Sequence, residues 1–412
     1  MDLYAWFTFF LTFTVLCGYL NYRFLKLPSA IGLTLVAFVL ALLLLVEEKL
    51  WPARSILSPL LSFLAHFPFE KALLHWMLGF LLFAGALHVE LETLMARLKS
   101  ILSLATLGVF ISTGLTAGLV FFLGKLAGLN IPFIWALLFG ALIAPTDPVA
   151  VLSLFKKAGV EKEREIVIVG ESLLNDGVAV VLFLSLLEML KAEEGFGLGH
   201  FFLLLGQEAV GGLLLGGALG YLSFLLLKSI DDYELEVLIT LALVMLCFTL
   251  AQRLHLSGPL AVVAAGLLIG NHGRRLAMSP LTVEHVDTFW RLIDSLLNAV
   301  LFLLVGLEVL LLSLKPLYLL LALASIPAVL AARFLSVGLS LKIVRPLGQL
   351  TLRETFFFTW AGLRGGIALA LCLSLPQGSL RELFLHFTYL NVLFSVLVQG
   401  LSIPRVAAFL KN

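Results

Sequence analysis

The sequence predicts an all-α protein that crosses a lipid membrane about thirteen times. Of the 412 residues, 61% are hydrophobic and only 13% are charged, about half the roughly 25% of a typical soluble protein. The mean hydropathy is +1.09. So few charges cannot cover the surface of a soluble protein of this size. No stretch alternates as a β-barrel strand does, so the spanning elements are expected to be helices.

The candidate spans are apolar runs of about 20 residues that end at charges, prolines or glycines. They cover approximately residues 3–22, 28–46, 70–89, 100–123, 131–155, 163–190, 201–227, 235–254, 258–270, 287–312, 316–342, 352–375 and 383–409. The loops between them are short, and none has a distinct composition that would indicate a separate domain. We therefore expect one integral membrane unit over residues 1–412, without a soluble domain.

The distribution of basic residues predicts the orientation of the chain. When residues near span ends are counted with the adjoining loop, seventeen of the 27 Lys and Arg residues belong to loops after odd-numbered spans or to the C-terminus and eight to loops after even-numbered spans, while Arg333 and Arg364 lie well inside spans. Cytoplasmic loops carry the excess of basic residues, so the N-terminus is expected outside the cell membrane and the C-terminus in the cytoplasm. The 26 Asp and Glu residues nearly balance the basic ones, which gives no reason to expect a nucleic-acid partner.

A few charged residues lie in the middle of spans, where each needs a reason. A charged side chain at mid-membrane costs roughly 2.5–3.5 kcal/mol even on the lenient insertion scale. Most charges of this chain lie at span ends, where water solvates them. The exceptions are Asp147, Glu171, Asp176 and Arg364, with Arg333 and Glu308 intermediate. These residues are the candidates for function.

Asp147 lies within Ala144-Pro145-Thr146-Asp147-Pro148, in the middle of an apolar span. Pro145 and Pro148 each remove a helical hydrogen-bond donor and disfavour the α conformation of the preceding residue. We therefore expect the helix to unwind around Thr146 and Asp147 and to free backbone carbonyl groups. Broken helices of this kind form ion sites near the middle of the bilayer. The alternative is a proline kink in which Asp147 only caps the second half of the helix.

The next span carries the segment Gly-Glu-Ser-Leu-Leu-Asn-Asp-Gly at 170–177. At 100° per residue, Ser172 and Asp176 share one face of the helix. Glu171 and Asn175 share a second face, about 100° away. The first face offers a carboxylate and a hydroxyl, which are hard oxygen ligands for a small cation. Glu171, on the second face, needs a counter-charge.

Arg364 is the predicted counter-charge for Glu171. It lies in Trp-Ala-Gly-Leu-Arg-Gly-Gly at 360–366, and no lysine lies in the interior of a span. Gly365 and Gly366, next to it, permit close helix approach or a second unwound segment.

The buried charges are expected to attract a cation or to take up a proton. Three carboxylates against Arg364 leave a net charge of −2, or −1 if Arg333 contributes. Burial and a neighbouring carboxylate both favour the protonated form of Asp176. A carboxylate that binds either a proton or a cation suffices for exchange, if the site is exposed alternately to the two sides.

Three segments of the chain resemble the monovalent cation/proton antiporter-1 family, which includes bacterial NhaP-type antiporters and the animal sodium/proton exchangers. The most specific segment is Gly-Glu-Ser-Leu-Leu-Asn-Asp-Gly at 170–177. Thr-Asp-Pro-Val-Ala at 146–150 and Gly-Leu-Arg-Gly-Gly at 362–366 accompany it. The resemblance runs over essentially the whole chain.

The resemblance implies two inverted repeats with unwound crossing helices, in a homodimer that works by elevator-like alternating access. The ion-carrying core domain is expected to include about 70–190 and 287–375, and the dimerisation domain about 3–46 and 201–254. The expected function is electroneutral exchange of one monovalent cation for one H⁺ in pH homeostasis, with Na⁺ first and Li⁺ or K⁺ as alternatives. No enzyme activity and no cofactor are expected.

The resemblance also implies roles for single residues. The expected ion site consists of Asp176, which matches the ion- and proton-binding aspartate, of the co-ligands Thr146, Asp147 and Ser172, and of Asn175. Glu171 and Arg364 match a structural ion pair. Asn175 stands where electrogenic relatives have a second aspartate, which implies electroneutral exchange.

One position departs from the family pattern. Many NhaP-type members have Glu in a Leu-Leu-Phe-Glu-Gly-Ala-Leu segment, where it joins the ion site, and this chain has Ala84 in that place. His88, one turn further along, is a candidate substitute, although a histidine near a span end is more often structural. The missing carboxylate leaves the preference among Na⁺, Li⁺ and K⁺ open.

Two other classes of protein fit the sequence less well. A cation-coupled symporter of a small organic anion, on a related inverted-repeat fold, would need a basic residue for the anion. Arg364 is already assigned to Glu171, and no second basic residue accompanies it. An intramembrane enzyme would need a motif such as His-Glu-x-x-His or Gly-x-Ser-x-Gly, and neither occurs.

Overall fold

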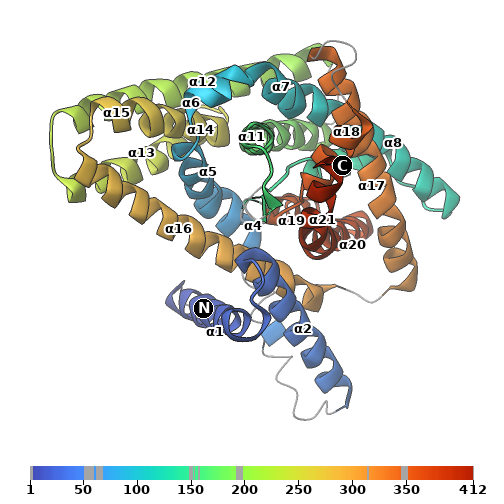
Figure 1. Ribbon diagram of the computed structural model, residues 1–412. Coiled ribbons are helices and arrows are strands. Elements are labelled where there is room, and N and C mark those ends of the chain that lie inside the picture. Colours follow the sequence, from blue (N-terminus) through green and yellow to red (C-terminus); the bar gives the residue numbers. More distant parts are fainter. Residues whose placement is uncertain are drawn as a thin grey trace.

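The computed structural model of the chain is built from helices (Figure 1). It describes residues 3–50, 60–61, 68–147, 152, 154–155, 158–191, 198–312, 315–344 and 351–411. Every regular element within these ranges is a helix or a helical turn, which confirms the predicted all-α class.

The helices are distributed evenly along the chain. The first part supplies α1 (Leu3–Leu20), α2 (Ser29–Leu50), α4 (Phe69–Lys71), α5 (Leu78–Leu87), α6 (Leu91–Ala96), α7 (Leu98–Ser103), α8 (Val109–Leu126), α9 (Phe133–Leu142) and α11 (Lys162–Lys191). The second part supplies α12 (Leu198–Lys228), α13 (Tyr233–Arg253), α14 (Gly258–Leu268), α15 (Arg274–Leu276), α16 (Pro280–Leu307), α17 (Pro316–Val344), α18 (Leu352–Ala361), α19 (Gly366–Leu373), α20 (Ser379–Phe394) and α21 (Gly400–Lys411). Short turns of wider or tighter helix continue several of them: η1 (Asn21–Leu25), η3 (Ala72–Met77), η4 (Leu104–Gly108), η5 (Ile269–Gly273), η6 (Glu308–Leu311) and η7 (Ser395–Gln399).

Ten continuous helices in the described part of the chain are long and apolar enough to cross a membrane, and the bent pair α18 and α19 adds an eleventh span. The chain is therefore a multi-pass membrane protein. The expected spans at 131–155 and 258–270 hold shorter helices, α9 and α14, and α14 continues through η5 into α15. The count of thirteen stays a prediction.

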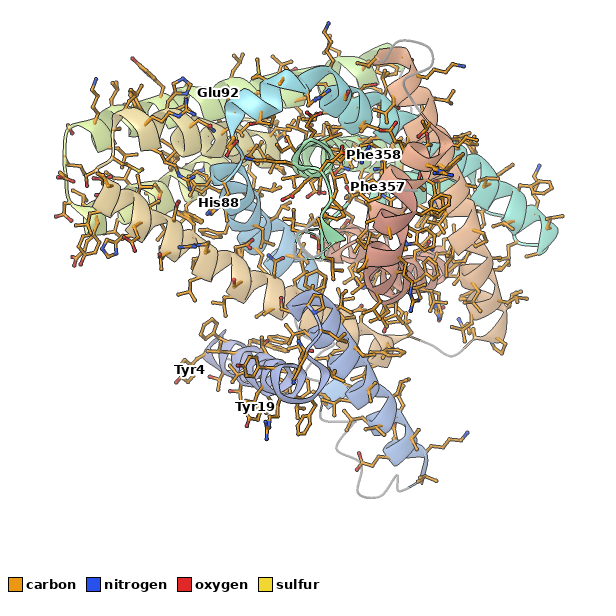
Figure 2. The ribbon with its side chains drawn as sticks, in the orientation of Figure 1. Tyr4, Tyr19, His88, Glu92, Phe357 and Phe358 are labelled. Atoms are coloured by element: carbon orange, nitrogen blue, oxygen red, sulfur yellow. The ribbon has the colours of Figure 1, made fainter. Side chains whose placement is uncertain are left out.

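The outer and inner faces of the bundle differ as a membrane requires. Tyr4 and Tyr19 on α1 point outward with 76% and 63% of their surface exposed, whereas Phe357 and Phe358 on α18 lie buried inside (Figure 2). Apolar and aromatic side chains that face lipid need no polar cover, so the aliphatic excess of the sequence is found on the outside as well as in the core.

The helices form two packing groups with α11 between them. In one group, α14 packs against α5, α12 and α13, and α16 packs against α2 and α5. In the other group, α17 packs against α8, α18 and α20, and α8 packs against α9. Helix α11 contacts members of both groups and lies near the centre of the molecule (Figure 1). Its polar segment at 170–177 is thus enclosed by protein, while the expected division into core and dimerisation domains stays a prediction.

Glycines allow α12 and α14 to approach each other closely. A Cβ atom on Gly216 would lie 1.9 Å from the carbonyl oxygen of Ala261, and one on Gly212 would lie 2.5 Å from that of Ser257. No side chain fits into that space, so the repeated glycines of α12 serve helix packing.

Candidate functional site

Two helices are interrupted inside the protein, and their non-helical segments cross. Helix α9 ends at Leu142, and residues 144–147 are not helical. The non-helical residues 362–365 separate α18 from α19, which are bent by 61° relative to each other. At the crossing, the amide N–H of Asp147 donates a hydrogen bond of 2.7 Å to the carbonyl oxygen of Leu363.

The residues expected to unwind these helices lie at the crossing. Pro145 is in the first non-helical segment, whereas Pro148 lies outside the described residues. Gly365 ends the second segment, and Gly366 starts α19. A Cβ atom on Gly365 would lie 2.8 Å from Oδ2 of Asp147, while the φ of Gly365, −115°, is open to any residue. Glycine is therefore required at 365 because a Cβ atom would collide with Asp147, and not because of the backbone conformation.

Polar side chains of α11 hold the first non-helical segment in place. Nδ2 of Asn175 donates a hydrogen bond of 2.9 Å to the hydroxyl oxygen of Thr146, and the amide of Thr146 donates to Oδ1 of Asn175 over 3.4 Å. The hydroxyl of Ser172 donates to the backbone carbonyl oxygen of Thr146. All three side chains are buried. The structure thus brings the expected co-ligands Thr146 and Ser172 together.

Glu171 forms its ion pair with Arg333 of α17. Nη2 of Arg333 lies 2.5 Å from Oε1 of Glu171, and both side chains are buried. This corrects the expectation that Glu171 pairs directly with Arg364. Arg364 instead donates from Nη1 to the carbonyl oxygens of Ala144, at 2.5 Å, and Pro145, at 3.2 Å.

The unwound segment explains the different pairing. Carbonyl groups that lose their helical partners inside a membrane protein need other donors, and a guanidinium group supplies several. Arg364 meets that need while it still interacts electrostatically with Glu171 and Arg333. Counting charges along the sequence does not include these freed carbonyl groups, and so it assigns Arg364 to the ion pair.

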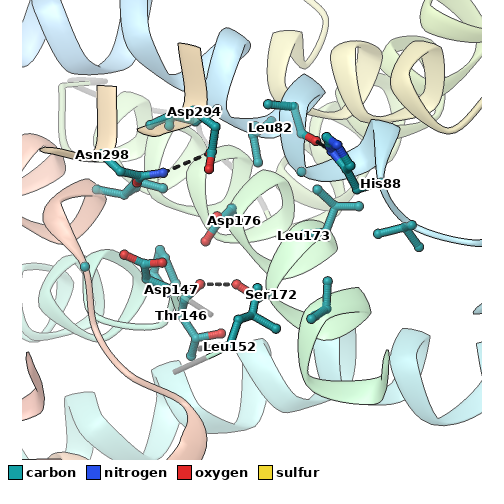
Figure 3. Close-up of a pocket in the computed structure, with 18 of the residues that line it drawn as sticks. Leu82, His88, Thr146, Asp147, Leu152, Ser172, Leu173, Asp176, Asp294 and Asn298 are labelled. Carbon is teal, nitrogen blue, oxygen red and sulfur yellow. Dashed lines mark hydrogen bonds between the residues drawn. The ribbon is translucent and has the colours of Figure 1, made fainter. Parts of the chain in front are cut away.

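Asp147 and Asp176 line one cavity of about 580 Å³, which also reaches Thr146 and Ser172 (Figure 3). Asp176 is only 7% exposed, and its Oδ1 accepts no hydrogen bond from any described residue. The carboxylates of Asp147, Glu171 and Asp176 stand against two guanidinium groups, so this group of residues carries a formal net charge of −1. A buried oxygen without a donor, in an anionic cavity, favours binding of a cation or a proton.

The lining of the cavity includes the exposed, charged side chains of Glu90, Lys162 and Arg291, and we call these three residues its mouth. Nζ of Lys162 lies 3.2 Å from Oε1 of Glu90, and Oγ1 of Thr93 donates a hydrogen bond of 2.9 Å to Oε2. The Thr93 hydroxyl and the Lys162 ammonium hold the pKa of Glu90 below its usual value. Glu90 therefore stays ionised at the mouth.

Two residues of α16 line the cavity although the sequence did not point to them. Nδ2 of Asn298 donates a hydrogen bond of 2.9 Å to Oδ1 of Asp294. The available signal was a polar pair four residues apart within the predicted span 287–312. On the opposite wall, Ala84 and His88 of the α5 region also line the cavity.

Comparison with known proteins identifies the family of the chain. A family model described as "Sodium/hydrogen exchanger, transmembrane" matches residues 11–409. The Na⁺/H⁺ antiporter NhaP of Pseudomonas aeruginosa is 45% identical to this chain over 399 residues, which are 96% of this chain and 94% of that protein. The Na⁺/H⁺ antiporter NhaH of Halobacillus aidingensis is 35% identical over 390 residues, which are 93% of this chain and 92% of that protein.

A solved structure shares the fold. The sodium proton antiporter MjNhaP1 from Methanocaldococcus jannaschii at pH 8 superposes with a TM-score of 0.76, covering 98% of this chain and 97% of that one at 22% identity. These likenesses confirm the resemblance predicted from the three motifs. The chain belongs to the sodium/hydrogen exchanger family, with bacterial NhaP-type antiporters among its relatives.

Proposed function

We propose that this protein is a secondary transporter that exchanges Na⁺ for H⁺ across the cell membrane. The relatives named above are Na⁺/H⁺ antiporters, which are transporters and not enzymes. The observation that carries the proposal is the carboxylate of Asp176, buried in the cavity with one oxygen that no described group hydrogen-bonds. That oxygen binds a proton or ligates a cation, but not both at once.

Asp147, Thr146 and Ser172 supply the other ligands of the cation in this mechanism. They add one carboxylate and two hydroxyl oxygens, hard donors that suit Na⁺ and leave Li⁺ and K⁺ as alternative cargoes. The side-chain amide of Asn175 donates one hydrogen bond to Thr146 and accepts another from it, and an amide does not titrate. Asp176 is then the carboxylate that alternates between proton and cation, and one cation is exchanged for one proton without net movement of charge.

Alternating access is proposed as an elevator movement of a core domain against a dimerisation domain, in a homodimer built on two inverted repeats. The hydrogen bonds between residues 144–147, α11 and residues 362–365 support this, because they tie the ion site into one unit. Ion pairs join residues 90–97 to residues 162–163 and to Arg275, and all of these residues are expected on the cytoplasmic side. With the N-terminus outside and the C-terminus in the cytoplasm, the cavity mouth faces the cytoplasm.

Reconstitution into liposomes with a pH-sensitive dye tests the proposal. Na⁺ is expected to dissipate an imposed pH gradient at a rate that does not depend on an imposed voltage, and parallel assays with Li⁺ and K⁺ define the preference. Asp176→Asn is expected to abolish exchange. The control Glu284→Gln, which removes an exposed carboxylate of α16, is expected to leave exchange unchanged. Full activity of Asp176→Asn would refute the site, and voltage dependence would refute the one-for-one exchange.

An organic-anion symporter is not favoured by the same geometry. Both buried guanidinium groups near the site are engaged, Arg333 with Glu171 and Arg364 with backbone carbonyl groups. Neither is left to bind an organic anion. Dissipation of the pH gradient by Na⁺ in the absence of any organic substrate distinguishes the two functions.

A further inference from the structure

A third aspartate lines the same cavity from a different wall. Asp294 lies on α16, whereas Asp147 lies on the first non-helical segment, residues 144–147, and Asp176 lies on α11. Figure 3 shows the carboxylate of Asp294 directed toward the side of the cavity where Asp176 lies. The mechanism proposed above gives Asp294 no role.

Asp294 lies between the mouth of the cavity and the crossing of the broken helices. Along α16, Arg291 is exposed, Asp294 is half-buried and Asn298 is buried, and all three line the cavity. Further along, Leu301 packs against the start of α19, where a Cβ atom on Gly366 would lie 2.2 Å from its Cδ1. At a rise of about 1.5 Å per residue, Asp294 is roughly 10 Å along α16 from that contact. A cation that enters at the mouth therefore meets Asp294 before it reaches the crossing.

The side chain that donates a hydrogen bond to Asp294 is neutral. The donor is Nδ2 of Asn298, and no ion pair of the described residues includes Asp294. His88 interacts electrostatically with Asp294 from the α5 side. Nδ1 of His88 lies 2.8 Å from the carbonyl oxygen of Ala84, and because a carbonyl only accepts, Nδ1 carries the hydrogen.

The basic side chains at the mouth are engaged elsewhere. Lys162 pairs with Glu90, and Arg291 donates to the carbonyl oxygen of Asp287 and to the hydroxyl of Thr288 on its own helix. Neither side chain forms an ion pair with Asp294, whose carboxylate is directed toward the cavity (Figure 3).

Asp176 gives an independent indication that the cavity takes a cation. Asp176 lines the cavity and is 93% buried, as follows from the exposed 7%, and its buried Oδ1 accepts no hydrogen bond from any residue that the structure describes. Carboxylates on three walls of one partly dehydrated space raise the local concentration of cations along the path between them. The amide oxygen of Asn298 adds a neutral oxygen ligand beside Asp294.

We propose that Asp294 and Asn298 form an access site, at which the cation binds and loses part of its hydration before it moves to Asp176. The inference rests on the proposed function for the identity of the cargo. The ligands of the access site are the carboxylate of Asp294 and the side-chain carbonyl of Asn298. The access site governs the affinity for the cation on the mouth side, whereas Asp176 governs the exchange itself.

Binding of ²²Na⁺ to the purified full chain tests the access site without transport. Asp176→Asn is expected to retain weak, saturable binding, and Asp176→Asn combined with Asp294→Asn is expected to lose it. Asp176→Asn combined with Glu284→Gln is the matched control and is expected to bind as Asp176→Asn alone does. Absence of binding in Asp176→Asn, or equal binding with and without Asp294, would overturn the access site.

Transport kinetics separate this inference from the proposed function. Asp294→Asn is expected to raise the KM for Na⁺ roughly tenfold and to leave the maximal rate within about twofold, because only cation capture is weakened. Asp294→Glu is expected to keep KM within about threefold, which shows that the charge and not the packing matters. A lower maximal rate at unchanged KM would overturn the access site. Retained binding without any Na⁺-dependent proton movement would refute the proposed antiport while leaving the access site standing.

Discussion

Glu171 and Arg333 form the ion pair, among those of the described residues, in which both side chains are almost fully buried. Removing one partner of a buried pair leaves the other charge without compensation, which costs about 3–5 kcal/mol, whereas removing both together costs far less. We therefore predict that Arg333→Met and Glu171→Gln each destabilise the protein strongly. The double variant is expected to recover most of that loss.

Thermal unfolding of the purified protein in detergent, followed by tryptophan fluorescence, measures the effect. A loss of this size corresponds to a fall in Tm on the order of 5 °C for a chain of this length. A double-mutant cycle gives the coupling energy, which we expect to be at least about 3–5 kcal/mol for Glu171 with Arg333, because the double variant is expected to lose no more stability than one single variant. The coupling of Glu171 with Arg364 is expected to be smaller, because that guanidinium donates to backbone carbonyl groups.

Arg405→Met is the matched control, since Arg405 is an exposed arginine of α21. Its effect on the free energy of unfolding is expected to stay within about 0.5 kcal/mol. The assignment of the ion pair would be refuted if Arg333→Met unfolded at the wild-type temperature. It would equally be refuted if the larger coupling energy belonged to Glu171 and Arg364.

Three further substitutions probe the cavity in proteoliposomes. Gly365→Ala places a Cβ atom 2.8 Å from Asp147, so we expect a loss of about 1–3 kcal/mol of stability and a higher KM for Na⁺. Gly217→Ala, where a Cβ atom meets nothing within 4 Å, is its control, and equal effects of the two would contradict the steric argument. Asn175→Asp adds a titrating carboxylate, and exchange is expected to become sensitive to a potassium diffusion potential; an unchanged rate would count against the role of Asn175 in electroneutrality. Ala84→Glu adds a carboxylate to the cavity wall and is expected to lower the KM for Na⁺ severalfold, whereas an unaltered KM would show that position 84 does not reach the cation.

The sequence predicts the interruptions of the helices better than the contacts made at them. The apolar runs predict helices because a chain in lipid has to satisfy its backbone hydrogen bonds within each segment. Pro145 and Gly365 indicate the non-helical segments 144–147 and 362–365, because the effect of proline and glycine on a helix is local and can be read from a single sequence. The roles of Arg333 and Asp294 depend instead on which side of α17 and α16 faces α11 and the cavity. A single sequence does not show which helix faces pack against each other. Counting charges therefore predicts Arg364, and not Arg333, as the partner of Glu171.

The hydrogen bonds from Arg364 to Ala144 and Pro145 connect residues 220 and 219 positions apart in the chain. During synthesis, the first broken helix therefore enters the bilayer long before its donor exists. A nascent chain that has inserted only as far as α17 carries uncapped carbonyl groups in the hydrocarbon region. The crossing of the two non-helical segments, where we propose the ion site, is consequently completed late in biogenesis. A chain that stops short of α18 leaves these carbonyl groups without the guanidinium group that donates to them.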